Sequence, residues 1–147
     1  MAASALLAIL AFTDSVSDAA LSARLGSSVI VVFVHPSRGA ATIHSLCGGH
    51  LLALAIGSVF ALLFFTPRVP SYLESQSLVH DAGLAAAVGI LILVMALTDT
   101  EHPPAAGTVF AMATRPWDLE IVVVIIAAAV ILAGFRTILG RRLKDLL

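Results

Sequence analysis

Three long apolar runs dominate the pattern of hydrophobic and polar positions along the chain. They cover residues 48–65, 82–98 and 121–135, and none of them contains Asp, Glu, Lys or Arg. A helix that crosses a bilayer needs about 20 predominantly apolar residues. Each run reaches that length once its flanks are counted, so the pattern predicts three membrane-spanning helices.

The N-terminal part of the chain is less regular. Residues 1–12 are apolar but short, the segment 13–28 is more polar, and the run VIVVFV at 29–34 is too short to span alone. The start lacks the positively charged region of a signal peptide, so we interpret it as the end of a short first helix. A lone strand at 29–34 would leave its backbone groups unsatisfied in lipid, and a short helix is therefore expected there.

The composition is that of a membrane protein. Of the 147 residues, 60% are hydrophobic and 12% are charged, against about 45–50% and about 25% in soluble domains. The formal net charge of −1 gives no attraction for nucleic acid, and the single cysteine, Cys47, excludes a disulfide framework and a cysteine-based metal site. The sequence thus predicts one all-α domain over residues 1–147, a polytopic membrane bundle of about four spans in contact with the lipid bilayer.

Basic residues predict an orientation for this bundle. Four of them lie near the C-terminus: Arg136, Arg141, Arg142 and Lys144. The positive-inside rule places this tail in the cytoplasm. Counting back through the three long runs then puts Arg38 and the segment 99–118 on the outer side.

The stretch EHPPAAGT at 101–108 interrupts the apolar chain. A residue before proline is pushed out of the helical region, so His102 and Pro103 are expected to be extended. Pro104 suits the first position of a new helix, where its missing N–H is not needed. A helix from there to about Thr114 would be roughly 16 Å long, or half a bilayer. The pattern predicts a broken span that ends in a half-helix.

A similar pattern occurs upstream. HPSRGAATI at 35–43 can be laid over HPPAAGTVF at 102–110, and each follows an aliphatic run. The match is either chance or an internal repeat of two halves, about 1–67 and 68–147. Paired interrupted helices mark the binding sites of many transporters, so broken or half helices are expected at both His-Pro turns.

The second turn has features of an anion site. Free N–H groups at a helix N-terminus bind small oxyanions, and Ala105, Ala106 and Gly107 would let a ligand approach the backbone. Thr108 adds a hydroxyl donor, and positive charge is expected from Arg38 and Arg115. The alternative is that the small residues serve helix–helix packing.

Ionisable residues near the span ends are candidates for proton coupling. Four histidines are predicted to lie on one side of the membrane: His35, His44, His50 and His102. Histidine titrates near neutrality, and Asp99 and Glu101 flank His102, where they would orient it or relay protons. The alternative is that both acids are solvated residues of an outer loop. The histidine spacing matches no helical metal motif, so neither a metal site nor another cofactor is expected.

Two segments together resemble the HPP family of integral membrane proteins: GGHLLALAIG at 48–57 and TDTEHPPAAGT at 98–108. The resemblance extends from about residue 25 through the last span. It implies four spans and, as in plant and cyanobacterial members, a role in nitrite transport. The chain departs from the family pattern at residues 43–45, in the order of residues 105–108, and at Asp99, where a basic or polar residue is common.

We therefore expect a small-anion transporter or channel, with nitrite as one candidate substrate, and no enzymatic activity. The substrate site is expected to combine the His-Pro-Pro turn and residues 105–108 with Gly48, Gly49 and His50. Because one short chain offers little protein to line a pathway, a homo-oligomer is expected. Two alternatives are a structural or sensory subunit, in which the turn only fixes packing, and a membrane enzyme that binds metal or haem through its histidines.

Overall fold

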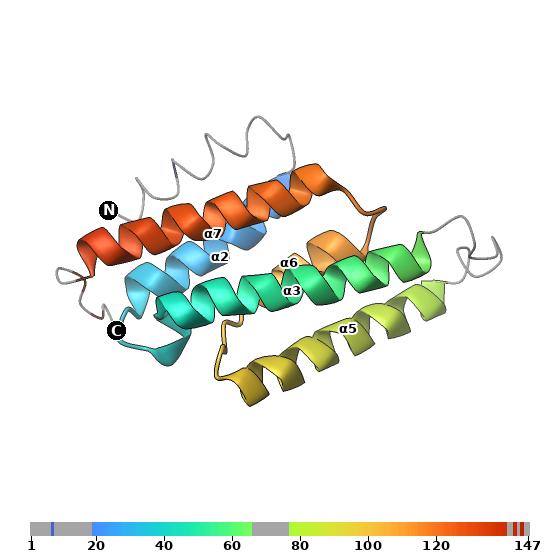
Figure 1. Cartoon of the computed structure of the whole chain (residues 1–147), viewed down its shortest axis with the longest axis horizontal. Helices are drawn as coiled ribbons and strands as arrows, with labels where there is room; N and C mark the ends of the chain where they lie inside the picture. The colour runs from blue at the N-terminus through green and yellow to red at the C-terminus, as the bar shows by residue number, and fades with distance from the viewer. Residues whose placement is uncertain (1–6, 8–18, 66–76, 141–142, 144, 146–147) are drawn as a thin grey trace.

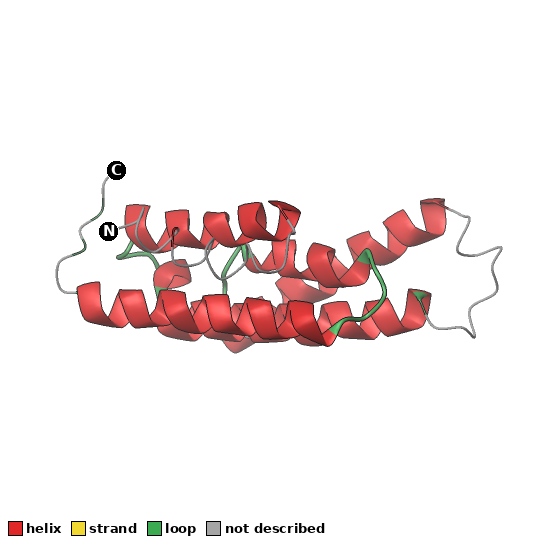
Figure 2. Cartoon of the chain, turned by 90° about the horizontal axis from the view of Figure 1, so that it is seen from above, coloured by secondary structure: helices red, strands yellow, loops and turns green. Residues whose placement is uncertain are grey.

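The computed structural model describes residue 7, residues 19–65 and 77–140, and residues 143 and 145. The elements in this part of the chain are α2 (Ala19–Val34), the 3-10 helix η2 (Gly39–Ala41), α3 (Ile43–Phe64), α5 (Ser77–Thr98), α6 (Ala105–Ala113) and α7 (Leu119–Leu139) (Figure 1). Figure 2 shows only helices and loops among these residues, so the predicted all-α class is confirmed. The helix predicted at 1–12 lies outside the described residues, Leu7 apart.

The helices α3, α5 and α7 are the three predicted spans. Each is apolar over 21 or 22 residues, which corresponds to about 32 Å of helix. They extend beyond the charge-free runs because polar residues cap two of their starts. Thr42 accepts a hydrogen bond from the N–H of Ser45 at 3.1 Å, and Asp118 accepts one from the N–H of Glu120 at 2.8 Å. The run at 29–34 is helical as predicted, but it belongs to α2, which begins earlier.

The centre of the bundle is α3. It packs most extensively on α6 and also contacts α5 and α7, while α2 packs on α6 and α7. Close approach of α3 and α6 needs a small residue, since a Cβ on Gly57 would lie 2.6 Å from Cβ of Met112. The helix α5 packs mainly on α3 and α6 and keeps an apolar outer face suited to lipid, where Leu97 is 77% exposed.

Both His-Pro turns and the C-terminal end of α7 lie at one end of the bundle, which we name the His-Pro end. Arg136 donates to the carbonyl oxygens of Pro36 at 2.9 Å and Ala41 at 3.3 Å. The Asp145 carboxylate accepts from the backbone N–H and the hydroxyl of Ser37. These two hydrogen bonds hold the pKa of the Asp145 carboxyl below its usual value.

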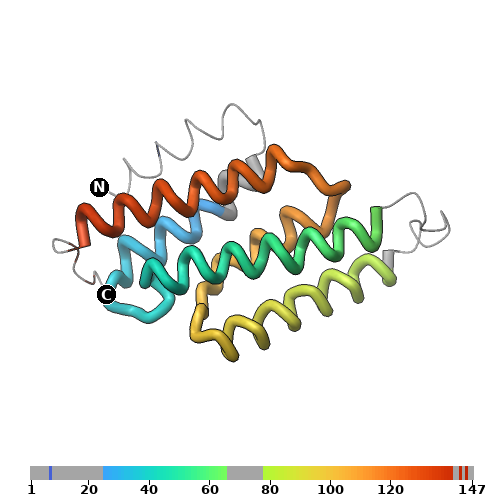
Figure 3. The backbone as a smooth tube through the Cα atoms, in the orientation of Figure 1, coloured from blue at the N-terminus to red at the C-terminus, as the bar shows by residue number. Residues whose placement is uncertain are grey.

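This arrangement corrects the predicted topology, which placed Arg38 and the segment 99–118 opposite the C-terminal tail. That count treated 99–118 as a connection on one side. In the structure the chain turns after α5 at the His-Pro end, and α6 then leads toward the other end, where α7 begins (Figure 3). The turn and α6 add a crossing, so the tail and both turns share a side.

A cysteine pair tests this shared side. In a Cys47→Ser background, which removes the one native cysteine, Ser37→Cys and Asp145→Cys are expected to form a disulfide or to be joined by a short thiol cross-linker. The reason is that the two native side chains are hydrogen-bonded. The readout is a mobility shift on a denaturing gel that reverses on reduction. The control pair Ser58→Cys and Asp145→Cys should stay unlinked, and linkage of the control pair alone would contradict the topology.

Candidate functional site

The C-terminal end of α5 sends the chain back across the bundle. The N–H of Thr100 donates to the carbonyl oxygen of Met95 at 3.0 Å, and Asp99 takes a left-handed backbone conformation with a φ of 54°. This is a Schellman ending, in which glycine is usual and aspartate is tolerated. It turns residues 100–104 toward α3, and α6 begins after Pro104.

The His-Pro-Pro turn packs on two adjacent glycines of α3. A Cβ on Gly48 would lie 2.6 Å from Cγ2 of Thr100, and a Cβ on Gly49 would lie 2.8 Å from Cβ of His102. Real Cβ atoms do not approach so closely, so this contact requires glycine. The structure thus brings together the turn and the glycine pair that the sequence singled out.

Four buried polar side chains from α2, α3, the turn and α6 form one hydrogen-bonded series, which we name the histidine chain. Thr108 Oγ1 lies 2.8 Å from His50 Nδ1, and His50 Nε2 lies 3.0 Å from Ser28 Oγ. Ser28 Oγ lies 3.1 Å from His102 Nε2, and His102 Nδ1 lies 2.7 Å from the carbonyl oxygen of Ala40. Each of the four side chains is at most 3% exposed.

The carbonyl of Ala40 fixes the direction of the histidine chain. A carbonyl oxygen only accepts, so His102 Nδ1 carries a proton and, in the neutral ring, Nε2 accepts from the Ser28 hydroxyl. Ser28 then accepts from His50 Nε2–H, and His50 Nδ1 accepts from the Thr108 hydroxyl. All donors point from Thr108 toward Ala40, and all four ring nitrogens are paired. The two His-Pro turns are joined by this last bond, since Ala40 belongs to the first and His102 to the second.

The start of α6 is not the open anion site that the sequence predicted. The N–H groups of Ala105, Ala106 and Gly107 donate to the carbonyl oxygens of residues 102, 103 and 104, all within 3.1 Å. Thr108 was expected to face a ligand and is instead bonded to His50. The expectation of free amides is wrong because the first turn of α6 closes with i→i−3 hydrogen bonds.

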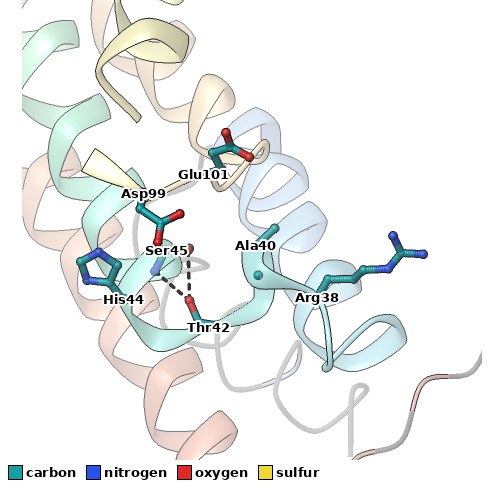
Figure 4. A pocket seen from close by; sticks show the side chains of 8 residues that line it. Arg38, Ala40, Thr42, His44, Ser45, Asp99 and Glu101 are labelled. Carbon is teal, nitrogen blue, oxygen red and sulfur yellow. Dashed lines mark hydrogen bonds between the residues drawn. The ribbon is translucent and has the colours of Figure 1, made fainter. Parts of the chain in front are cut away.

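A cavity of about 530 Å³ opens at the His-Pro end. Eight residues line it: Arg38, Gly39, Ala40, Thr42, His44, Ser45, Asp99 and Glu101. In Figure 4 the side chains of Thr42, His44 and Asp99 lie together, whereas that of Arg38 extends away from them. The charged residues of the lining are two acids, Asp99 and Glu101, and Arg38, whose guanidinium points away from them. Ser45 is 4% exposed and accepts from the Thr42 hydroxyl at 3.0 Å, while its own proton is donated to none of the described residues.

A second cavity, of about 480 Å³, adjoins the same turn between α5 and α6. Its lining is mainly apolar: Ile92, Met95, Ala96, Glu101, His102, Pro103 and Ala106. Glu101 lines both cavities, so the His-Pro-Pro turn separates a polar cavity from an apolar one.

Arg115 is not part of this arrangement. It follows α6 toward the end of the bundle where α7 begins, away from the polar cavity to which it was expected to contribute charge. Among the described residues, no three His, Cys, Asp or Glu side chains lie close enough to hold a metal ion.

The motif at the centre of this geometry agrees with the comparison to protein families. A model described as the HPP transmembrane region matches residues 1–144. The chain belongs to the HPP family. No curated protein and no solved structure gives a match. In this HPP-family chain the motif supplies a buried histidine at His102 and two prolines without N–H groups, and it closes against the glycine pair of α3.

Three polar residues of the site were missed in the sequence: Ser28, Thr42 and Ser45. Ser28 was assigned to a polar segment, yet it bridges His50 and His102 inside the bundle. Thr42 was noted only as part of the repeated pattern, yet it caps α3 and lines the polar cavity. Ser45 was noted only as a departure from the family pattern, yet it is buried beside that cavity. The available signal for Ser28 was its position one residue before the aliphatic run 29–34, which favours a buried helix over a solvated loop there.

Proposed function

We propose that this HPP-family chain is a transporter or channel for a small inorganic anion, with nitrite as a candidate. The observation that carries the proposal is the polar cavity at the His-Pro end, which directly adjoins a fully buried histidine chain in an apolar bundle. Ionisable groups inside a membrane protein are costly and commonly mark a substrate pathway. Broken helices at such a site are a feature of many transporters.

The cavity, rather than the N-terminus of α6, would provide the donors for the anion. Ser45 has a hydroxyl proton to donate, and Arg38 at the rim supplies positive charge. Asp99 and Glu101 oppose an anion, because a like charge a few ångströms away costs about 1 kcal/mol in water. Both acids are exposed, and we assign them to control of anion entry.

We also propose that the His-Pro end faces the cytoplasm. Five of the eight Lys and Arg residues belong to this end or directly follow it in sequence: Arg38, Arg136, Arg141, Arg142 and Lys144. The positive-inside rule then places the cavity mouth with the tail on the cytoplasmic side. A homo-oligomer is part of the same proposal, since one chain offers few helices to line a pathway.

Neutralising the cavity acids tests the proposal with a defined sign. In proteoliposomes, uptake of nitrite, nitrate or chloride should exceed that of empty liposomes for at least one anion. Asp99→Asn and Glu101→Gln should each raise that uptake about threefold to fivefold at low salt. Each variant removes a repulsion of about 1 kcal/mol, and 1.4 kcal/mol corresponds to a tenfold change in binding. Asn tolerates the left-handed backbone at position 99. Glu120→Gln, at the start of α7 and the other end of the bundle, is the matched control and should change nothing.

A second candidate function is supported by the burial of His102. Its side chain is 0% exposed and joins two turns and α2, as a purely structural or sensory subunit would require. Absence of flux for every anion in a folded, reconstituted wild type would favour this candidate over transport.

A further inference from the structure

The histidine chain has a second state that follows from its hydrogen-bond direction. In the neutral state Ser28 donates to His102 and accepts from His50. One added proton changes this. If the Thr108 hydroxyl turns aside, His50 Nδ1 binds the proton, and Ser28 then takes a proton from His50 Nε2 while giving its own to His102 Nε2. Ser28 ends with the same number of protons, His50 is neutral with Nδ1–H, and His102 carries the charge.

Charge repulsion limits the histidine chain to one such added proton. The rings of His50 and His102 have centroids 5.1 Å apart and are both buried. Two positive charges at that separation in a buried site repel strongly. The pair can therefore hold at most one added proton, and Ser28 lies where it can pass that proton between the two rings.

The stored proton also changes the charge beside the polar cavity. The lining carries two carboxylates and one guanidinium, so its formal charge is negative while the histidine chain is neutral. His102 Nδ1 is 2.7 Å from the carbonyl of Ala40, which itself lines the cavity. A proton on His102 offsets the excess negative charge there. An anion is thus bound best when the histidine chain is protonated.

We propose that this chain carries its anion together with one proton held on the histidine chain, and that Ser28 passes the proton between His50 and His102. This rests on the proposed anion transport. The charged and titratable groups around the histidine chain come from the first turn, α3, the second turn and α7: His35, Arg38, His44, Asp99, Glu101 and Arg136. Arg136 is engaged with backbone carbonyls, so its charge is already held by polar partners.

Proteoliposomes with a pH-sensitive dye inside test the coupling, with nitrite as the probe and the membrane potential clamped. Wild type should acidify the lumen by one proton for each nitrite taken up, beyond the nitrous acid leak of empty liposomes. An inward proton gradient should accelerate uptake. Ser28→Ala keeps both rings but removes the bridging oxygen, so it should lower proton-coupled uptake at least tenfold. Ser28→Thr keeps the hydroxyl and should restore coupling, and Ser58→Ala, on the far half of α3, should behave as wild type.

The outcomes separate the two proposals. Nitrite flux without lumenal acidification in wild type would overturn proton coupling and leave anion transport standing. Equal coupling in Ser28→Ala and wild type would overturn the role of Ser28. Absence of flux for any anion would overturn both proposals together. The proton-to-nitrite ratio of the wild type decides the coupling even if Ser28→Ala fails to fold, which a thermal unfolding scan of each variant reports.

Discussion

Replacing His102 by alanine should lower the free energy of unfolding by about 3–5 kcal/mol, as for other large buried rings truncated to alanine. The imidazole is 0% exposed and lies among the fully buried side chains of the bundle. Its loss leaves a cavity and removes the partners of the Ala40 carbonyl and the Ser28 hydroxyl. A buried polar group left unsatisfied costs about 1–3 kcal/mol by itself.

The measurement is denaturant or thermal unfolding of purified protein in detergent. His44→Ala is the matched control, because that ring is exposed and its hydrogen bond, to the carbonyl of Thr98, is long at 3.5 Å. The control should change stability by less than about 0.5 kcal/mol. Equal stability of the two variants would mean that His102 does not hold the two turns together.

This expected instability changes how a loss of transport in His102→Ala should be interpreted. For a solvent-exposed histidine, such a variant would separate a packing role from a transport role. The structure shows that the ring joins α2 and both turns, so its removal disturbs packing whatever the function. Substitutions of the exposed acids Asp99 and Glu101, and Ser28→Ala, which removes a single oxygen atom, disturb packing less than His102→Ala. They are therefore better tests of function.

The fold was predictable where the signal is local. Span length follows from counting apolar residues, and the break at His102 follows from two prolines. The half-helix α6 follows from the distance between Pro104 and the next break at Arg115-Pro116. None of these features needs a distant partner.

The histidine chain was not predictable because its contacts are long-range. Ser28 meets His50 across 22 positions and His102 across 74, and His50 meets Thr108 across 58. In sequence Ser28 is one polar residue in a serine-containing stretch. Only the packing of α2 on α6 and α7 places it between two rings.

The topology error has a similar origin. Nine residues of α6 are too few to count as a span by hydropathy, so the count omitted this crossing. The turn and α6 together nevertheless lead the chain from the His-Pro end toward the start of α7. The predicted free amides failed for a different reason, since the sequence could not show that the first turn of α6 would close on the carbonyls of the motif itself.

Gly49→Ala should also destabilise the bundle, by about 1–3 kcal/mol, the usual cost of overpacking. Two effects oppose each other. Alanine is favoured over glycine in a helix by about 1 kcal/mol, but the new Cβ would lie 2.8 Å from Cβ of His102 and 3.2 Å from the carbonyl oxygen of Thr100. Neither atom is the end of a flexible side chain, and the ring of His102 is bonded at both nitrogens. Overpacking should therefore win.

Gly89→Ala on α5 is the matched control, because nothing lies within 4 Å of its new Cβ. Helix propensity then acts alone, and this variant should be more stable than wild type by up to about 1 kcal/mol. Opposite signs for the same substitution, measured by unfolding in one detergent, would show that α3 holds the His-Pro-Pro turn by direct contact. A stabilised Gly49→Ala would mean that the turn has space to move away from α3. The residue displaced by the new Cβ is His102. The histidine chain could then not be held rigidly in place by α3.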